Sequence, residues 1–440
     1  MNRTAREPGL LWPALWRLAL AGGAFLVVYG FCNRFTATRD DLGTWMWEWE
    51  RRIPFVREFI IPYWSLDLFF CGAFFICTTK VELDLLTKRL VAVTFASGLC
   101  FLLFPLQMGL PRPEPEGWTA PLFHALYAGD MPYNLAPSLH ISLRSLIWVV
   151  YGAHLRGWWR GAAKLWFIAI GASTLLVRQH HVIDVATGFL MGWIIAALIP
   201  DPRVVVTRNP SGKLARRYGA GAVVCAALAV LWFGFAWPAV ALGITALAYS
   251  TGNPRLFGKE NGTLSPAAEW CLLPVILVRY FIQRRWLKRK PAWREVAPGL
   301  LLGRIVNDHE AEELLAGGPL AVLDLTAESN APKPFREHAV YRNLPMLDLV
   351  PPSAADVSRA LEFLHEQTPQ RRVFLHCQLG LQRSATIAAH WLVAHGSARD
   401  LEHAKAQLRQ LDPEINFPLP ISQHPLPAAS SNEPSDKSSR

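Results

Sequence analysis

Residues 371–385 read RRVFLHCQLGLQRSA and decide the fold of the C-terminal part of the chain. The apolar run Val373–Leu375 predicts a short buried strand, and the apolar spacing of Ser384–His395 predicts a helix that ends at Gly396. The loop between them is Cys377–Arg383. Backbone N–H groups of such a loop point inward, and the helix N-terminus adds its positive end. The stretch therefore predicts a small α/β domain with an anion-binding loop.

The residue types in this loop suit phosphoryl transfer through a cysteine. The positive field favours the thiolate of Cys377, which is the nucleophilic form and needs a reducing compartment. Arg383 can bind two phosphate oxygens with its planar fork. Ser384 is placed to donate to the sulfur when a phosphoenzyme breaks down, and Gly380 relieves the backbone where the loop curls.

The run His376–Ser384 resembles the signature of the dual-specificity branch of the protein tyrosine phosphatases, and the resemblance covers roughly residues 295–415. It implies that an upstream aspartate is general acid to the leaving oxygen and then general base to water. Asp348, in LDLVPP, occupies the expected place, whereas Asp324 ends an apolar run and is interpreted as structural. The implied site consists of the catalytic residues Cys377, Arg383, Asp348, Ser384 and His376, and of the substrate-binding loop positions Gln378, Leu379, Gly380, Leu381 and Gln382.

The uncharged side chains of the loop bear on the substrate. Phosphoinositide phosphatases of this superfamily often carry Lys or Arg there to meet extra phosphates, whereas Gln378, Leu381 and Gln382 are uncharged. A highly phosphorylated headgroup is therefore disfavoured, and a singly phosphorylated lipid, sugar alcohol or protein is expected. This domain is expected over residues 291–416, followed by a disordered tail over 417–440.

The rest of the chain is strongly apolar. Hydrophobic residues make up 52% of the chain, and stretches long enough to approach a bilayer span recur between Leu10 and Ile282. We predict a polytopic all-α membrane domain over residues 1–205, with a retained first span rather than a cleaved signal peptide. Six spans are expected near residues 11–32, 59–79, 90–110, 139–154, 163–179 and 182–199.

Basic residues cluster between these spans. The net charge of +10 therefore follows the positive-inside pattern and disfavours a nucleic-acid partner. The basic loops follow the second, fourth and sixth spans and are expected in the cytosol, so the loops after the third and fifth spans face the exterior. Their basic residues are Lys80, Lys88 and Arg89, then Arg156, Arg160 and Lys164, and then Arg203, Arg208, Lys213, Arg216 and Arg217.

Residues 206–290 are expected to hold additional membrane or interfacial segments and a basic linker. The apolar block Gly219–Tyr249 fits either one long span or a hairpin broken near Pro238. The weaker block 266–283 can span or lie in the interface. The basic run Arg284–Lys290 places the following domain in the cytosol, either through topology alone or through contact with anionic lipid.

A second group of ionisable residues lies beside the spans. His180 and Asp184 are spaced i and i+4, so on a helix the carboxylate can orient the imidazole. Phosphoryl transfer through phosphohistidine requires a His nucleophile, an opposing His acid and Arg ligands. Over about residues 55–200 these pieces resemble the type-2 phosphatidic acid phosphatases. The resemblance implies His180 as nucleophile, Asp184 as its orienting partner, His140 as leaving-group acid, and Arg112 and Ser138 as phosphate ligands.

Two positions depart from the usual pattern of that family. Pro105 stands where a Lys is usual and Thr174 where an Arg is usual, so Arg178 is the candidate substitute ligand. The pattern is nearer the branch that includes inositol-phosphoryl transferases, and both hydrolysis and transfer stay open. The adjacent His181 is interpreted as a bystander, with an exchange of roles with His180 left open.

Three functions are compatible with this combination, and no metal or cofactor is implied. The first is a bifunctional phosphatase of lipid-linked phosphomonoesters in a bacterial inner membrane, with an exterior His site and a cytosolic Cys site. The second is a transferase of phospho-alcohol headgroups whose cysteine domain trims a phosphate. The third is a degenerate membrane half that anchors a phosphatase of phosphoproteins.

Overall fold

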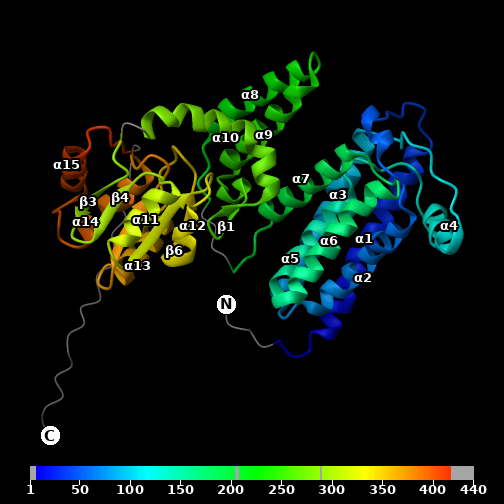
Figure 1. Cartoon of the computed structure of the whole chain (residues 1–440), viewed down its shortest axis with the longest axis horizontal. Helices are drawn as coiled ribbons and strands as arrows, with labels where there is room; N and C mark the ends of the chain where they lie inside the picture. Colours follow the sequence, from blue (N-terminus) through cyan, green and yellow to red (C-terminus); the bar gives the residue numbers. More distant parts are fainter. Residues whose placement is uncertain (1–5, 204–207, 288–289, 418–440) are drawn as a thin grey trace, which may run out of the picture. The chain divides into compact units, whose positions relative to one another are not determined.

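The computed structural model describes residues 6–203, 208–287 and 290–417. The chain divides into two compact units, Met1–Val206 and Thr207–Arg440. Figure 1 labels the helices and strands of both units.

The first unit is built of α-helices joined by loops and short 3-10 turns. Its helices are α1 (Leu11–Thr36), α2 (Ile60–Ile76), α3 (Lys80–Leu103), α4 (Ala120–Gly129), α5 (Leu139–His154), α6 (Gly157–Leu176) and α7 (Val182–Leu198). Within the described residues, three segments are long and apolar enough to cross a membrane, by length and composition: Leu11–Thr36, Arg57–Ile76 and Lys80–Leu103. The other three predicted spans form α5, α6 and α7, of which α7 is an apolar helix of 17 residues.

The helix boundaries correct the predicted basic loops. The third span was predicted over 90–110, but α3 begins at Lys80 because the side chain of Thr79 caps its first turn by accepting from the Glu82 N–H. Lys80, Lys88 and Arg89 therefore lie on a helix and not in a loop. Arg89 is buried and donates to the carbonyls of Ala196 and Ile199, at the end of α7. Likewise α6 begins at Gly157, so Arg160 and Lys164 are helical.

Small residues allow α5 and α7 to approach each other closely. A Cβ added at Gly188 of α7 would lie 2.6 Å from the carbonyl oxygen of Ser138. The Ser142 hydroxyl donates to the Gly188 carbonyl at 2.9 Å. This contact brings the N-terminus of α5, which carries His140, toward the N-terminus of α7, which carries Asp184.

Residues 208–287 form a largely helical segment of the second unit, called the appendage below. Helix α8 (Gly212–Ala229) packs against helix α9 (Ala236–Thr251). Of the two alternatives for this apolar block the structure adopts the hairpin, and the break lies at residues 230–235, a few residues before Pro238. Pro238 sits in the first turn of α9, where its missing N–H costs no helical hydrogen bond.

Two short strands and a third helix complete the appendage. Strand β1 (Lys259–Glu260) pairs antiparallel with β2 (Thr263–Leu264), and helix α10 (Pro266–Leu287) follows. Residues 206–290 are predicted to hold membrane or interfacial segments and a basic linker. The appendage lies in one compact unit with the C-terminal domain.

The C-terminal domain is α/β, as predicted. Its sheet has the strand order β3-β4-β7-β5-β6, in which β3 and β4 are antiparallel and the other neighbours are parallel. The strands are β3 (Trp293–Ala297), β4 (Leu300–Gly303), β5 (Leu320–Thr326), β6 (Val340–Met346) and β7 (Arg372–His376). The helices are α11 (Asp308–Ala316), α12 (Lys333–His338), α13 (Ala354–Gln367), α14 (Arg383–Ala394) and α15 (Leu401–Leu411). Because β5, β6 and β7 run parallel, the loops after them meet at one edge of the sheet.

Helices cover both faces of this sheet. Leu323 and Val373 pack into one apolar cluster with residues of α13, α14 and α15, and the alternate positions Val322 and Phe374 pack into another with residues of α11 and α12. All seven residues of β5 are buried. A strand covered on both faces shows a continuous apolar run, which explains the pattern used to predict β7.

The two ends of this domain correct the predicted boundaries. Lys290, assigned to the membrane-facing basic run, makes ion pairs with Glu414 and, at 2.7 Å, with Asp412. Phe417, assigned to the tail, is buried in the apolar cluster that contains α14. The rest of the predicted tail, 418–440, lies outside the described residues.

Candidate active sites

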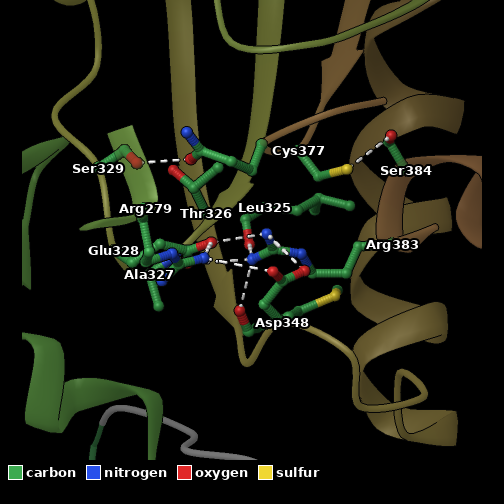
Figure 2. Close-up of polar contacts among 12 residues, drawn as sticks. Arg279, Leu325, Thr326, Ala327, Glu328, Ser329, Asp348, Cys377, Arg383 and Ser384 are labelled. Carbon is green, nitrogen blue, oxygen red and sulfur yellow. Dashed lines mark hydrogen bonds and ion pairs between the residues drawn. The ribbon is translucent and has the colours of Figure 1, made fainter. Parts of the chain in front are cut away.

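The candidate nucleophile follows directly on the buried strand β7. Cys377 is 3% exposed, and α14 begins six residues later, at Arg383. Figure 2 shows the hydroxyl of Ser384 donating to the sulfur of Cys377, at 3.2 Å. The predicted thiol and its predicted donor are therefore in contact at a helix N-terminus, where a thiolate and a bound phosphate are both stabilised.

The loop between them curls against β4. Gly380 has φ +73°, and a Cβ there would lie 2.8 Å from the carbonyl of Gly303, so the close approach of the two backbones requires a glycine. The carbonyl of Gln378 accepts from the Ile305 N–H, and its side chain accepts from Ser329. Leu379, Leu381 and Gln382 are half-buried. The loop is thus held against the end of β4, Ile305 and Ser329.

The guanidinium of Arg383 is completely buried beside this loop. It donates to both carboxylate oxygens of Glu328, at 2.7 and 3.1 Å, and to the carbonyl of Met346 at 2.9 Å. A further ion pair joins it to Asp348 at 3.2 Å. The side chain is therefore fixed by acceptors on the loops that follow β5 and β6 (Figure 2).

Sequence reasoning missed Glu328. It is 6% exposed and follows β5, so the parallel sheet brings it to the same edge as Cys377. Its position just after an apolar run could have indicated a site residue, because the loops that follow parallel strands form the binding sites of α/β sheets. No local spacing links it to Arg383.

The candidate general acid lies on the loop after β6. Asp348 is 26% exposed, and its two carboxylate oxygens face two arginines, Arg383 at 3.2 Å and Arg279 at 3.3 Å. Leu349, the next residue, has φ +58°, a strained conformation for a side chain of this type. The turn leaves the carboxylate in contact with Arg383, the first residue of α14.

The competing aspartate and the signature histidine lie beneath the loop. Asp324 is fully buried and accepts from Lys259 at 2.6 Å and from Tyr341 at 2.6 Å. Burial alone would raise the pKa of Asp324, but the charge of Lys259 outweighs it and holds that pKa below its ordinary value. The predicted catalytic residue His376 stacks on Phe374, its ring nitrogens are buried, and its Nε2 lies 3.8 Å from Asp324 Oδ1. Burial also lowers the pKa of His376.

Replacing Glu328 by glutamine is expected to destabilise the fold in a pH-dependent way. Burial alone would raise the pKa of Glu328, but the charges of Arg383 and Arg279 outweigh it and hold that pKa well below its ordinary value. The ionised pair therefore stabilises the fold at neutral pH, and this contribution is lost as the pH falls through the depressed value. Glu328→Gln should lower the free energy of unfolding by about 3 kcal/mol near neutrality.

The measurement is denaturant unfolding of the full chain, followed by tryptophan fluorescence at several pH values. The difference between variant and wild type should shrink toward zero below about pH 3. Glu312→Gln, at an exposed position of α11, is the matched control. A difference that stays constant with pH would contradict this account of the Glu328 carboxylate.

The first unit brings several of the predicted histidine-site residues together. His180 Nδ1 lies 3.6 Å from Asp184 Oδ2, and both residues are buried. The ring of His140 stacks on that of Tyr63, with centroids 4.4 Å apart. Ser138 caps α5 and its N–H donates to the Asp184 carbonyl at 2.9 Å. Within the described residues, His180 Nδ1, His140 Nε2 and Asp184 Oδ1 are buried without a hydrogen-bond partner.

The two adjacent histidines have different surroundings. His181 Nδ1 lies 3.2 Å from a carboxylate oxygen of Glu50, and its Nε2 accepts from the Gly109 N–H at 3.0 Å. Both nitrogens of His181 are thus engaged, which favours His180 for the chemistry. Glu50, only 1% exposed, was missed because it lies far away in a mixed-charge loop.

The two predicted arginine ligands are placed differently. Arg112 donates to the Asp130 carbonyl at 2.7 Å and to Gln179 at 3.3 Å, next to His180 in sequence. Arg178 has φ +54°, and its Nε is buried without a hydrogen-bond partner among the described residues. Across residues 6–203, 208–287 and 290–417, no group of three or more His, Cys, Asp or Glu is placed to hold a metal ion.

Comparison with known proteins bears on the C-terminal domain. A family described as "Swiss Army Knife protein, DSP-PTPase phosphatase domain" matches residues 293–434. Dual specificity protein phosphatase 1-B of Xenopus laevis is 30% identical over 131 residues, which cover 28% of this chain and 34% of that protein. Human dual specificity protein phosphatase 4 is 32% identical over 132 residues, which cover 28% of this chain and 32% of that protein. The chain thus spans about a third of the length of these relatives. Its C-terminal domain is a cysteine phosphatase domain of the dual-specificity type.

Two solved structures are also similar. Tk-PTP in the active form aligns with a TM-score of 0.27 and 21% identity, covering 28% of this chain and 87% of that one. PTPMT1 in complex with PI(5)P aligns with a TM-score of 0.27 and 20% identity, covering 29% of this chain and 88% of that one.

Proposed function

We propose that this chain is a membrane phosphatase that uses Cys377 to hydrolyse lipid-linked phosphomonoesters. The observation that carries the proposal is the contact of Cys377 with Ser384 at the N-terminus of α14, beside Arg383 and Asp348. A loop of this kind binds a phosphoryl group through backbone N–H groups, which is electrostatic stabilisation aimed at the transferring oxygens.

The reaction proceeds in two steps on these residues. The Cys377 thiolate attacks phosphorus and forms an S–P bond, while the bond from phosphorus to the leaving oxygen breaks and Asp348 gives that oxygen a proton. Asp348, now a carboxylate, then takes a proton from water as the water oxygen attacks phosphorus. The S–P bond breaks, Ser384 donates to the departing sulfur, and inorganic phosphate leaves.

The membrane location rests on the first unit. Its three long apolar helices expose large apolar side chains such as Leu26, Leu68 and Leu99, which are 70%, 75% and 59% exposed. Helices with this much exposed apolar surface suit a lipid environment. We propose the inner membrane of a bacterium as the location, and the basic residues that follow α7 support a C-terminal domain on the cytosolic side. Phosphomonoesters of membrane lipids are then the substrates within reach.

The second part of the proposal assigns phosphatase activity to the first unit at an exterior site. The His180–Asp184 pair supports it, as do His180 Nδ1 and His140 Nε2, which are buried without a hydrogen-bond partner among the described residues. His180, its ring oriented by Asp184, attacks phosphorus and forms an N–P bond while the bond to the leaving oxygen breaks and His140 gives that oxygen a proton. Water then loses a proton to His140 as its oxygen attacks phosphorus, the N–P bond breaks, and inorganic phosphate leaves. Arg112, Ser138 and Arg178 are the proposed phosphate ligands.

His180→Ala is expected to lower the hydrolysis of phosphatidic acid or phosphatidylglycerol phosphate at this site by about 10³-fold or more, because it removes the nucleophile. Turnover of a water-soluble aryl phosphate by Cys377 should be unchanged. His124→Ala, at an exposed position of α4, is the matched control. Release of phosphate from the purified full chain is measured in mixed micelles, with Cys377→Ser as the background. Full lipid turnover by His180→Ala in that background would exclude the histidine site.

Two other functions are favoured by specific observations. Pro105 and Thr174 stand where the type-2 phosphatidic acid phosphatases usually carry basic residues, and this departure favours transfer of a phospho-alcohol headgroup to an acceptor lipid. The test uses a lipid with a radiolabelled headgroup. If the label appears only as free phosphate and never on an acceptor lipid, transfer is excluded. The relatives are named protein phosphatases, which favours a phosphoprotein substrate for Cys377. The Asp348→Ala variant lacks the general acid and should retain bound substrate. If lipids but no phosphoproteins are recovered with it, a phosphoprotein substrate is excluded.

A further inference from the structure

An arginine from outside the phosphatase domain reaches its candidate active site. Arg279 lies on α10 of the appendage, ahead of residues 293–434, which match the phosphatase family. Its Nη2 donates to Glu328 Oε1 at 2.7 Å and to Asp348 Oδ2 at 3.3 Å. Figure 2 shows the two guanidinium groups of Arg279 and Arg383 meeting the two carboxylates in one cluster.

The appendage also holds the backbone of the Asp348 loop. The hydroxyl of Tyr249, on α9, donates to the Asp348 carbonyl at 3.1 Å, and its ring stacks on Tyr218 of α8 with centroids 5.3 Å apart. The side-chain amide of Asn209 donates to the Pro351 carbonyl. Three separate side chains of the appendage therefore contact residues 348–351.

The loop that carries Glu328 is held from the same side. Ala331 donates its N–H to the Gly262 carbonyl at 2.7 Å, and the Leu264 N–H donates to Asn330 at 2.6 Å. Lys259, at β1, reaches Asp324 beneath the same loop. The appendage thus supports both loops that supply carboxylates to Arg383.

We propose that the appendage is part of the catalytic unit and that Arg279 is the positioning residue for the general acid Asp348; this rests on the proposed function of Cys377. Arg383 is committed to Asp348 through Oδ1 and must turn toward a phosphoryl group when one binds. Oδ2 of Asp348 then still accepts from Arg279, and Arg279 stays on Asp348 while Arg383 binds the phosphoryl group. The oxygen released by Arg383 carries the proton that is passed to the leaving group.

The test is a comparison of two leaving groups on the full chain. General acid catalysis matters most for a basic leaving oxygen, so Arg279→Ala should lower kcat/KM for phenyl phosphate by about 10-fold to 100-fold, a part of the 10²–10⁴-fold that a positioned acid supplies. The loss for p-nitrophenyl phosphate should be about 3-fold or less. In an Asp348→Ala background the same substitution should change either rate by no more than about 2-fold.

Two further variants separate positioning from folding. A single nitrogen of Arg279 makes both contacts, so Arg279→Lys should recover most of the phenyl phosphate rate. Arg217→Ala, at an exposed position of α8, should match wild type. Inhibition by inorganic phosphate, which reports the Cys377 loop and Arg383, should be the same in wild type and Arg279→Ala.

The outcomes distinguish this inference from the proposed function. Wild-type turnover that is absent, or insensitive to Cys377→Ser, overturns the proposed function and the inference with it. Cys377-dependent turnover that Arg279→Ala leaves unchanged overturns the inference alone. The inference also fails if the loss is equal for both leaving groups or adds fully to that of Asp348→Ala, because either result is that of a merely structural role.

Discussion

Cys377→Ser is expected to reduce phosphomonoester turnover by the C-terminal domain by about 10⁵-fold or more, to the level of the background reaction. A serine hydroxyl is almost wholly protonated at neutral pH, and no base contacts this position to activate it among the described residues. The loop and the helix N-terminus keep their fields, so phosphate binding should survive while the covalent step is lost. Substrate therefore accumulates on the variant instead of turning over.

Two measurements check this result. Release of phosphate from an aryl phosphate gives the rate, and mass spectrometry of quenched protein detects a phosphate on Cys377 in wild type only. Cys71→Ser, at an exposed cysteine of α2, is the matched control and should retain the wild-type rate. Substantial turnover of an aryl phosphate by Cys377→Ser would refute a thiolate nucleophile at this loop.

Arg383→Lys is expected to lower kcat/KM by about 10³-fold, with the fold retained. Lysine keeps the positive charge but cannot present two parallel N–H donors to the transferring oxygens. It also cannot satisfy Glu328 and Met346 together, as the guanidinium does. The loss should fall mostly on kcat, since the bidentate contact strengthens as charge builds on the phosphoryl oxygens in the transition state.

Kinetics on an aryl phosphate measure this loss, and unfolding of the same sample shows whether the buried site survives. Arg279 still pairs with Glu328 in the variant, so a buried carboxylate is not left alone. Arg399→Lys, at a largely exposed position, should behave as wild type. A rise in KM with an unchanged kcat would mean that Arg383 only binds substrate and does not stabilise the transition state.

The amino-acid sequence determined the centre of the phosphatase domain because that centre is contiguous. A buried strand, a loop of fixed length and a helix start occur within fifteen residues, and they place Cys377, Arg383 and Ser384 together by local geometry. The resemblance to a known family then added Asp348. Apolar runs likewise predicted six helices of the first unit but not α4, and a capping threonine moved the start of α3 to Lys80.

Only the tertiary structure decided which partners this loop has. Glu328 and Arg279 lie 55 and 104 residues before Arg383 in the sequence, and no periodicity or local motif relates them to it. Because β5, β6 and β7 are parallel, the loops that carry Glu328 and Asp348 lie at the same end of the sheet as Cys377. The packing of α10 brings Arg279 into contact with both carboxylates. Such contacts depend on how distant elements pack, and packing is a property of the folded chain that local sequence patterns do not contain.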